Sequence, residues 1–303
     1  MHPLTNKTLQ KQDSTIFELS EEEQLLVINR LHQVLRPFLL RRVKSEVEKE
    51  LPPKSESVIK VELSDWQKLV YNGISKKGRL ARDPATGKIG NQSLRNAMMQ
   101  LRKIVNHPYL FLDAQNFTID DWIYMSSGKF ELLDRIIPKF IKSGHKILIF
   151  SQFTKLLNLM CIFLEYRGIK HCRLDGGMKQ EERHENVLKF QDHMADYNVF
   201  LLSTRAGGHG LNLQVADTVI IFDSDFNPQM DEQAKDRAHR IGSKAEVRVY
   251  RLISNSQVEE GILNKALSKK DLDNKIIQAG MFNQKASDQE RQLKLENLIR
   301  AQF

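Results

Sequence analysis

The feature that most constrains the fold is an alternation of short apolar runs with longer helical segments, which begins near residue 126. The apolar runs, which we expect to be strands, are residues 146–150, 199–203, 218–222 and 247–253, with a weaker run at 170–174. The intervening segments, which we expect to be helices, are residues 128–142, 154–167, 179–193, 229–240 and 257–268. Parallel strands require crossover connections, so this alternation predicts an α/β fold with a doubly wound parallel sheet and helices on both faces.

The chain ahead of residue 126 has a different, mainly helical pattern. Ser20 and Glu23 form a capping box, and apolar residues at helical spacing follow until Pro37. Residues 82–90 are rich in Pro and Gly and are expected to form a loop. A second amphipathic helix ends at residues 106–108. Its apolar stripe, which we expect in the core, is Leu94, Met98, Leu101 and Val105.

Composition narrows the class of protein. The chain has 303 residues, of which 41% are hydrophobic, and this is ample for a buried core. Its apolar runs fall far short of the ~20 residues that cross a bilayer, so we expect no membrane association. Two cysteines, Cys161 and Cys172, are too few for a disulfide framework or a four-cysteine zinc site. The histidines lack metal-ligand spacing, and we predict no metal site.

Positive charge is concentrated in one region. The formal net charge is +8, and residues 64–110 account for +7 of it, with nine basic and two acidic residues. Such a concentration favours contact with a polyanion through counterion release. A solvated charged surface is the alternative interpretation.

Residues that follow the predicted strands are the first candidates for a site, because ligands gather at the carboxyl ends of parallel strands. Ser151, Gln152 and Lys155 stand where a helix begins and can either grip a phosphate or cap the helix. Gly176 and Gly177 follow the weaker strand and either allow close approach of another chain or form a simple turn.

A glycine-rich loop follows the strand at 199–203. It is not a Walker A loop, since no Gly-Lys-Ser/Thr follows. The dinucleotide fingerprint also fails, because Leu213 stands where its third glycine belongs. His209 lies between two of the glycines, where it could titrate near neutral pH or face solvent.

The segment 229–240 carries two arginines at helical spacing. Gln233, Arg237 and Arg240 stand at i, i+4 and i+7, which predicts that they share one face of a helix. Two converging guanidinium groups suit a triphosphate, as arginine fingers do. A surface helix with ion pairs is the alternative.

Several of these segments together resemble a known family. Residues 203–213, 217–223 and 236–242 resemble motifs V and VI of SWI/SNF-type chromatin-remodelling ATPases of helicase superfamily 2. The flanking segments 36–42, 100–109, 127–134 and 277–282 resemble the same family, and the resemblance covers residues 18–296. It implies helical linker and protrusion segments at 1–125 after a first lobe, a second RecA-like lobe at 126–270, and a brace with a helical tail at 271–303.

The resemblance also implies roles for individual residues. Arg237 and Arg240 would reach the γ-phosphate of ATP, Gln233 would help to arrange the same site, and Gly210 and Asn212 would border the nucleotide. The residues implied to contact the DNA backbone are Ser151, Gln152, Lys155, Gly176, Gly177 and Thr204. Phe226 stands where close relatives carry tryptophan, and it would either contact a base or sugar or serve as a packed aromatic.

At the level of the whole protein, the resemblance implies a DNA-dependent ATP hydrolase in the nucleus. Its cofactor is ATP with Mg²⁺, which the first lobe mainly holds. Its partners are that first RecA-like lobe, double-stranded DNA or the nucleosome, and other subunits of a remodelling complex.

The 303 residues contain neither a Walker A sequence nor Asp-Glu-x-His. We therefore expect a fragment or a split gene product that does not hydrolyse ATP by itself. A non-catalytic DNA- or partner-binding module and an RNA helicase lobe are the alternatives.

Overall fold

The computed structural model describes residues 52–80, 91–111, 119–192, 194–205, 211–240, 243 and 245–278. Residues 48–270 form one compact unit, and the fold below is that unit. The helix expected after Ser20, the loop at 82–90 and the tail beyond residue 278 lie outside the described residues. Among the helices that are described, none has the length and apolar character needed to cross a membrane.

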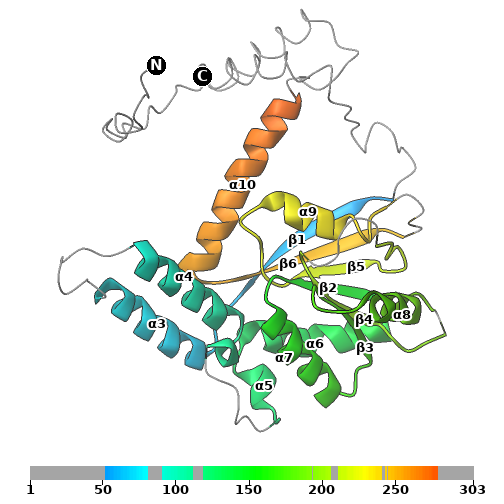
Figure 1. Cartoon of the computed structure of the whole chain (residues 1–303), viewed down its shortest axis with the longest axis horizontal. Helices are drawn as coiled ribbons and strands as arrows, with labels where there is room; N and C mark the ends of the chain where they lie inside the picture. The colour runs from blue at the N-terminus through cyan, green and yellow to red at the C-terminus, as the bar shows by residue number, and fades with distance from the viewer. Residues whose placement is uncertain are drawn as a thin grey trace, which may run out of the picture. The chain divides into compact units, whose positions relative to one another are not determined.

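Six strands form a single sheet in the order β1-β6-β5-β2-β4-β3, and every pairing is parallel (Figure 1). The strands are β1 (Lys54–Val61), β2 (Ile147–Ser151), β3 (His171–Leu174), β4 (Val199–Ser203), β5 (Thr218–Ile221) and β6 (Val247–Ser254). All residues of β2, β4 and β5 are buried, as expected for parallel strands covered on both faces. The predicted α/β fold with a parallel sheet is confirmed.

Five helices lie next to the central strands in sequence. Helix α6 (Gly128–Lys142) precedes β2, and α7 (Thr154–Tyr166), α8 (Gln180–Gln191), α9 (Pro228–Lys235) and α10 (Gln257–Gln278) follow β2, β3, β5 and β6. The helices that precede them are α3 (Asp65–Leu80), α4 (Asn91–Asn106) and the short α5 (Trp122–Met125), with a 3-10 turn at Pro108–Leu110. Helix α6 has the predicted bounds, and α7 and α8 lie within two residues of theirs.

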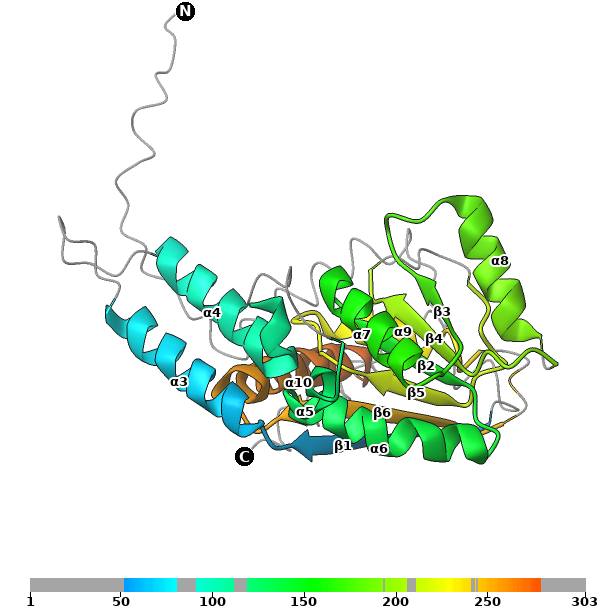
Figure 2. The ribbon, with the colours of Figure 1, turned by 90° about the horizontal axis from the view of Figure 1, so that it is seen from below.

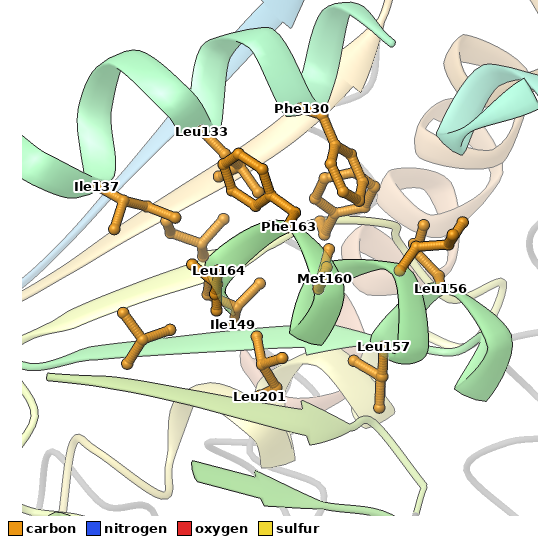
Figure 3. Packing of buried hydrophobic residues seen from close by; sticks show 14 of the residues in the cluster. Phe130, Leu133, Ile137, Ile149, Leu156, Leu157, Met160, Phe163, Leu164 and Leu201 are labelled. Carbon is orange, nitrogen blue, oxygen red and sulfur yellow. The ribbon is translucent and has the colours of Figure 1, made fainter. Parts of the chain in front are cut away.

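The two faces of the sheet are covered by different helices. Helices α6 and α7 pack on one face, where Phe130, Leu133 and Phe163 meet Ile149 and Leu201 (Figure 3). The other face packs against α8 and α9 through a second set of buried residues, which includes Phe150, Phe190, Phe200, Leu213, Ala234 and Ala238. Alternate residues of β2 therefore point to opposite cores, and this confirms the doubly wound arrangement.

Strand β1 is the main element that the sequence reading did not anticipate. It lies within the region expected to be helical, and it pairs with β6 over its whole length, from Lys54 opposite Val247 to Val61 opposite Ser254. Six of its eight residues are exposed. The strand could not be predicted from local sequence because an edge strand with charged residues has no continuous apolar run. Its pairing partner, β6, also stands almost 200 positions later in the chain.

Helices α3 and α4 lie side by side near the end of the sheet where β1 stops (Figures 1 and 2). Helix α4 ends at Asn106 as predicted, and Val105 is fully buried. The expected core stripe is only partly correct, because Met98 is 43% exposed. The apolar spacing identifies the helix, but α3 covers only part of the stripe.

Candidate functional site

The loops that follow β2, β4 and β5 meet at the carboxyl edge of the sheet. The amide of Thr204 donates a hydrogen bond to the carbonyl of Ser151 at 3.0 Å. The Gln152 amide donates to the Asp223 carboxylate at 3.1 Å, and its side-chain amide donates to the Ser224 carbonyl at 2.6 Å. Three of the segments singled out in the sequence are therefore joined at one place.

Asp223 lies at the centre of this junction and is 1% exposed. Burial raises the pKa of its carboxyl group from 3.8 to about 6. The Ser151 hydroxyl, the charges of Lys129 and Arg102, and the Gln152 amide oppose this rise. Asp223 thus acts as a buried acceptor that ties the end of β5 to the end of β2.

Arg102 comes to the same junction from helix α4. Its guanidinium carbon lies 5.3 Å from the centre of the Phe153 ring and 5.0 Å from that of Phe226. One of its nitrogens is 3.4 Å from the Ser224 carbonyl and 3.9 Å from the Asp223 carboxylate. Arg102 is 5% exposed, so this member of the basic region 64–110 is not part of a solvated or DNA-facing surface.

The residues that the resemblance assigns to DNA differ in their exposure. Lys155, Gly176 and Gly177 are exposed, and Gln152 is partly exposed. The Ser151 and Thr204 side chains are buried, at 0% and 3% exposure. The Ser151 hydroxyl accepts a hydrogen bond from the Phe153 amide and binds Asp223. Burial of these two hydroxyls places them inside the loop junction and not on its surface.

The turn after β3 is organised by its own side chains. The Asp175 carboxylate accepts a hydrogen bond from the Gly177 amide at 2.9 Å and pairs with Arg173 at 2.6 Å. Arg183 donates to the carbonyls of Asp175 and Gly176, both at 3.2 Å. Two arginines of the surrounding strand and helix therefore hold the exposed glycines in one position.

Phe226 is partly exposed, at 38%. One side of the ring contacts the Arg102 guanidinium. The adjacent Asp225 carboxylate accepts from the Asn227 amide at 2.9 Å and lies 3.5 Å from the exposed Arg205. The ring is therefore packed on a cation and also open to solvent.

The arginine segment departs from the predicted helix. Helix α9 ends at Lys235 and not near residue 240. Arg237 and Arg240 follow it in tight turns, in which the Arg237 amide donates to the Ala234 carbonyl and the Arg240 amide to the Ala238 carbonyl. The prediction that Gln233, Arg237 and Arg240 share one face of a continuous helix is therefore wrong. Turns with shorter-range hydrogen bonds replace the α-helical ladder.

The two arginines occupy different surroundings. The guanidinium carbon of Arg237 lies 5.8 Å from the centre of the Phe150 ring, and burial lowers the pKa of this arginine. Its carbonyl accepts from the Leu213 amide, so the turn is joined to the end of the glycine-rich loop. Arg240, Gln233 and Asn212 are exposed, and Gly210 and His209 lie outside the described residues.

An ion-pair network holds helix α9 against the sheet. Arg251 of β6 pairs with Asp231 of α9 and with Glu56 of β1, and Lys235 pairs with Glu56 at 2.7 Å. Glu232 accepts from Lys235 at 2.8 Å and from Lys270 of α10 at 2.7 Å. Burial alone would raise the pKa of Glu232, but these lysines outweigh it and lower the pKa to about 2. The network fixes the helix from which the arginine turns begin.

Among the residues that the structure describes, no group of three or more His, Cys, Asp or Glu side chains is arranged to hold a metal ion.

The sequence reading missed the buried polar residues below the loops. Lys129 donates to Glu259 at 2.6 Å, to the Phe222 carbonyl at 2.8 Å and to Asn106 at 3.3 Å. The sequence analysis included Arg102 only as part of the basic region 64–110, and Asp223 only as the residue after the strand expected at 218–222. Each of the three has an apolar residue on one side only, and this local pattern does not reveal which distant groups a charged side chain meets.

Comparison with known families gives two matches. Residues 128–242 match the helicase conserved C-terminal domain, and residues 3–110 match the SNF2-related domain. Among solved structures, the chain is similar to the C-terminal part of the Fun30 ATPase domain, with a TM-score of 0.60 and 29% identity. That similarity covers 71% of this chain and 89% of the other.

Curated relatives are similar over most of this chain. It is 53% identical to chromatin structure-remodeling complex subunit snf21 of Schizosaccharomyces pombe and 53% identical to probable ATP-dependent DNA helicase CHR23 of Arabidopsis thaliana. It is 51% identical to nuclear protein STH1/NPS1 of Saccharomyces cerevisiae. These matches cover 93%, 93% and 94% of the chain but only 24%, 26% and 22% of the relatives. The chain therefore carries a segment that matches the SNF2-related domain and a helicase conserved C-terminal domain, and over most of its length it is similar to SWI/SNF-type chromatin-remodelling proteins.

Proposed function

We propose that this chain is the second motor lobe of an ATP-dependent DNA translocase that remodels nucleosomes in the nucleus. The observation that carries the proposal is the meeting of the loops after β2, β4 and β5 at one edge of a parallel sheet. The names of the similar proteins, which include a chromatin-remodeling complex subunit, a DNA helicase and a nuclear protein, support the same class.

On the DNA side, the exposed groups at this edge suit a phosphate backbone. The Lys155 ammonium can pair with a phosphate, and Gly176 and Gly177 allow a backbone to approach closely. The buried Ser151 and Thr204 would act by holding the loops that present Gln152. Contacts of this kind do not read sequence, and a translocase that steps along any DNA requires that property.

On the nucleotide side, Arg237 and Arg240 would complete a triphosphate pocket whose other wall belongs to a first lobe. Burial of Arg237 beside Phe150 lowers the local dielectric, so its charge acts more strongly on a nearby phosphate than it would in water. Gln233, Asn212 and Gly210 would border the same pocket. ATP would be the phosphoryl donor, and Mg²⁺, which the first lobe would mainly hold, would offset the negative charge of its phosphates.

The test is turnover of the full-length enzyme with Arg240→Ala. We expect ATP hydrolysis to fall by about 10³- to 10⁵-fold, the usual contribution of an arginine finger. DNA affinity and the circular dichroism spectrum should remain unchanged, since Arg240 is exposed and lies after α9. Near-normal hydrolysis by the variant would refute the assignment of Arg240.

The same preparation separates this proposal from its alternatives. Stimulation of hydrolysis by duplex DNA supports a DNA translocase, whereas greater stimulation by RNA points to an RNA helicase. DNA binding without hydrolysis by the full-length protein points to a non-catalytic module. Other remodelling subunits and the first lobe are the partners that this proposal implies.

A further inference from the structure

Arg102 joins two parts of the chain that match different family domains. It lies on α4, inside the SNF2-related match, and its contacts lie in loops of the helicase C-terminal match. Among the exposed or partly exposed residues of those loops, Phe226 and Gln152 are proposed to touch DNA. The buried Arg102 thus contacts both the loop after β2, which carries Gln152, and the loop after β5, which carries Phe226.

The geometry is that of a cation between two rings. The guanidinium carbon is about equally far from the Phe153 and Phe226 rings, at 5.3 and 5.0 Å. Both distances are within the range in which a cation is attracted to an aromatic ring. The Ser224 carbonyl accepts one hydrogen bond from Arg102 at 3.4 Å and another from the Gln152 side-chain amide at 2.6 Å. A planar guanidinium can stack and donate at the same time, whereas an ammonium cannot.

We propose that Arg102 is a positioning residue for DNA contact, which holds the Phe226 ring at a fixed orientation on the sheet edge. Helix α4 thereby sets the position of the loop that carries Phe226. Because Phe226 retains 38% exposure while it contacts Arg102, the part of the ring that remains open can still meet a base or sugar. This inference rests on the proposed role of Phe226 in DNA binding.

The experiment compares Arg102→Lys with the unsubstituted 303-residue chain. Arg102→Lys keeps the charge but removes the planar stack. The control is Arg135→Lys on α6, an exposed arginine that pairs with Glu131 of the same helix. Affinity for fluorescein-labelled duplex DNA is measured by anisotropy, and we expect Arg102→Lys to weaken it about three- to tenfold, because an ammonium cannot stack on the ring and donate to the Ser224 carbonyl as the planar guanidinium does. Arg135→Lys should leave the affinity unchanged.

A second readout reports on the ring without DNA. A Phe226→Trp chain, made in a Trp66→Phe, Trp122→Phe background to remove both native indoles, is quenched with acrylamide. We expect Arg102→Lys to increase the quenching constant of the indole at 226. An unchanged quenching constant would overturn the proposal. If the unsubstituted chain does not bind DNA, the proposed function fails, but the quenching result still decides whether Arg102 positions the ring.

A double-mutant cycle separates positioning from general destabilisation. In a Phe226→Ala background, Arg102→Lys should cause no further loss of DNA affinity, because the ring that it orients is gone. An equal loss in both backgrounds would mean that Arg102 acts through the fold as a whole, and this would overturn the inference.

Discussion

The buried ammonium of Lys129 offers the sharpest test of what holds the loop edge in place. Lys129 is 1% exposed and donates to Glu259, to the Phe222 carbonyl and to Asn106. Lys129→Met keeps most of the length of the side chain but removes the ammonium, and with it the charge and all three donated hydrogen bonds. Glu259, which is 6% exposed, then keeps the Ser254 amide at 2.6 Å as a donor but loses its cation.

The expected cost follows from the uncompensated charge. Removing one partner of a buried pair typically costs about 3–5 kcal/mol, because the other charge remains buried. For a unit of this size, each kcal/mol lowers the melting temperature by roughly 2–4 °C, so we expect a fall of about 6–20 °C. Adding Glu259→Gln, which keeps an acceptor for the Ser254 amide, should restore part of the loss.

Thermal and urea unfolding, followed by circular dichroism, measure these changes. The matched control is Lys139→Met on the same helix, where the side chain is exposed and the change should stay within about 0.5 kcal/mol. Two results would refute the reasoning. One is a loss below about 1 kcal/mol for Lys129→Met. The other is a double variant whose loss equals the sum of the two single losses.

Two further predictions concern the backbone and the titrating groups. A Cβ at Gly128 would lie 1.9 Å from the Glu62 carbonyl oxygen, so Gly128→Ala should destabilise by about 1–3 kcal/mol, whereas Gly73→Ala, with nothing within 4 Å, should stabilise the exposed helix by roughly 0.5–1 kcal/mol. Equal unfolding midpoints in urea for the two variants would contradict this. Because the Asp223 carboxyl has a pKa of about 6 when folded and 3.8 ordinarily, the folded state binds the proton first, and this group adds stability as the pH falls from 6 to 4. Glu232 acts in the opposite direction, since its pKa of about 2 stabilises the fold above pH 4.5 and the benefit is lost as the pH falls toward 2. Unfolding of Asp223→Asn and Glu232→Gln across pH 2–7 should show these opposite slopes relative to the unsubstituted chain, and parallel profiles would contradict both.

Local patterns were sufficient for most of the sheet. Five of the six strands were expected close to their observed positions. The signal was clearest for β2, β4 and β5, because central parallel strands are buried on both faces and their apolar runs are continuous. The bounds of α6 were predicted because its apolar spacing and its ends are both local signals. Strand β1 was missed because an exposed edge strand is specified mainly by its pairing with β6.

The end of α9 and the surroundings of Arg102 could not be predicted from local patterns. The spacing of Gln233, Arg237 and Arg240 fits a helix, yet the chain turns after Lys235 and joins the Arg237 carbonyl to the Leu213 amide. Arg102 carries the same charge as the exposed Lys68 of α3, but folding places it between Phe153 and Phe226. The amino-acid sequence by itself determined the parallel sheet, its order of helices and the motifs of the family, since these depend on periodicity and short segments. Only the tertiary structure decided which charged side chains are buried and what they hold, because burial and pairing depend on residues distant in the chain.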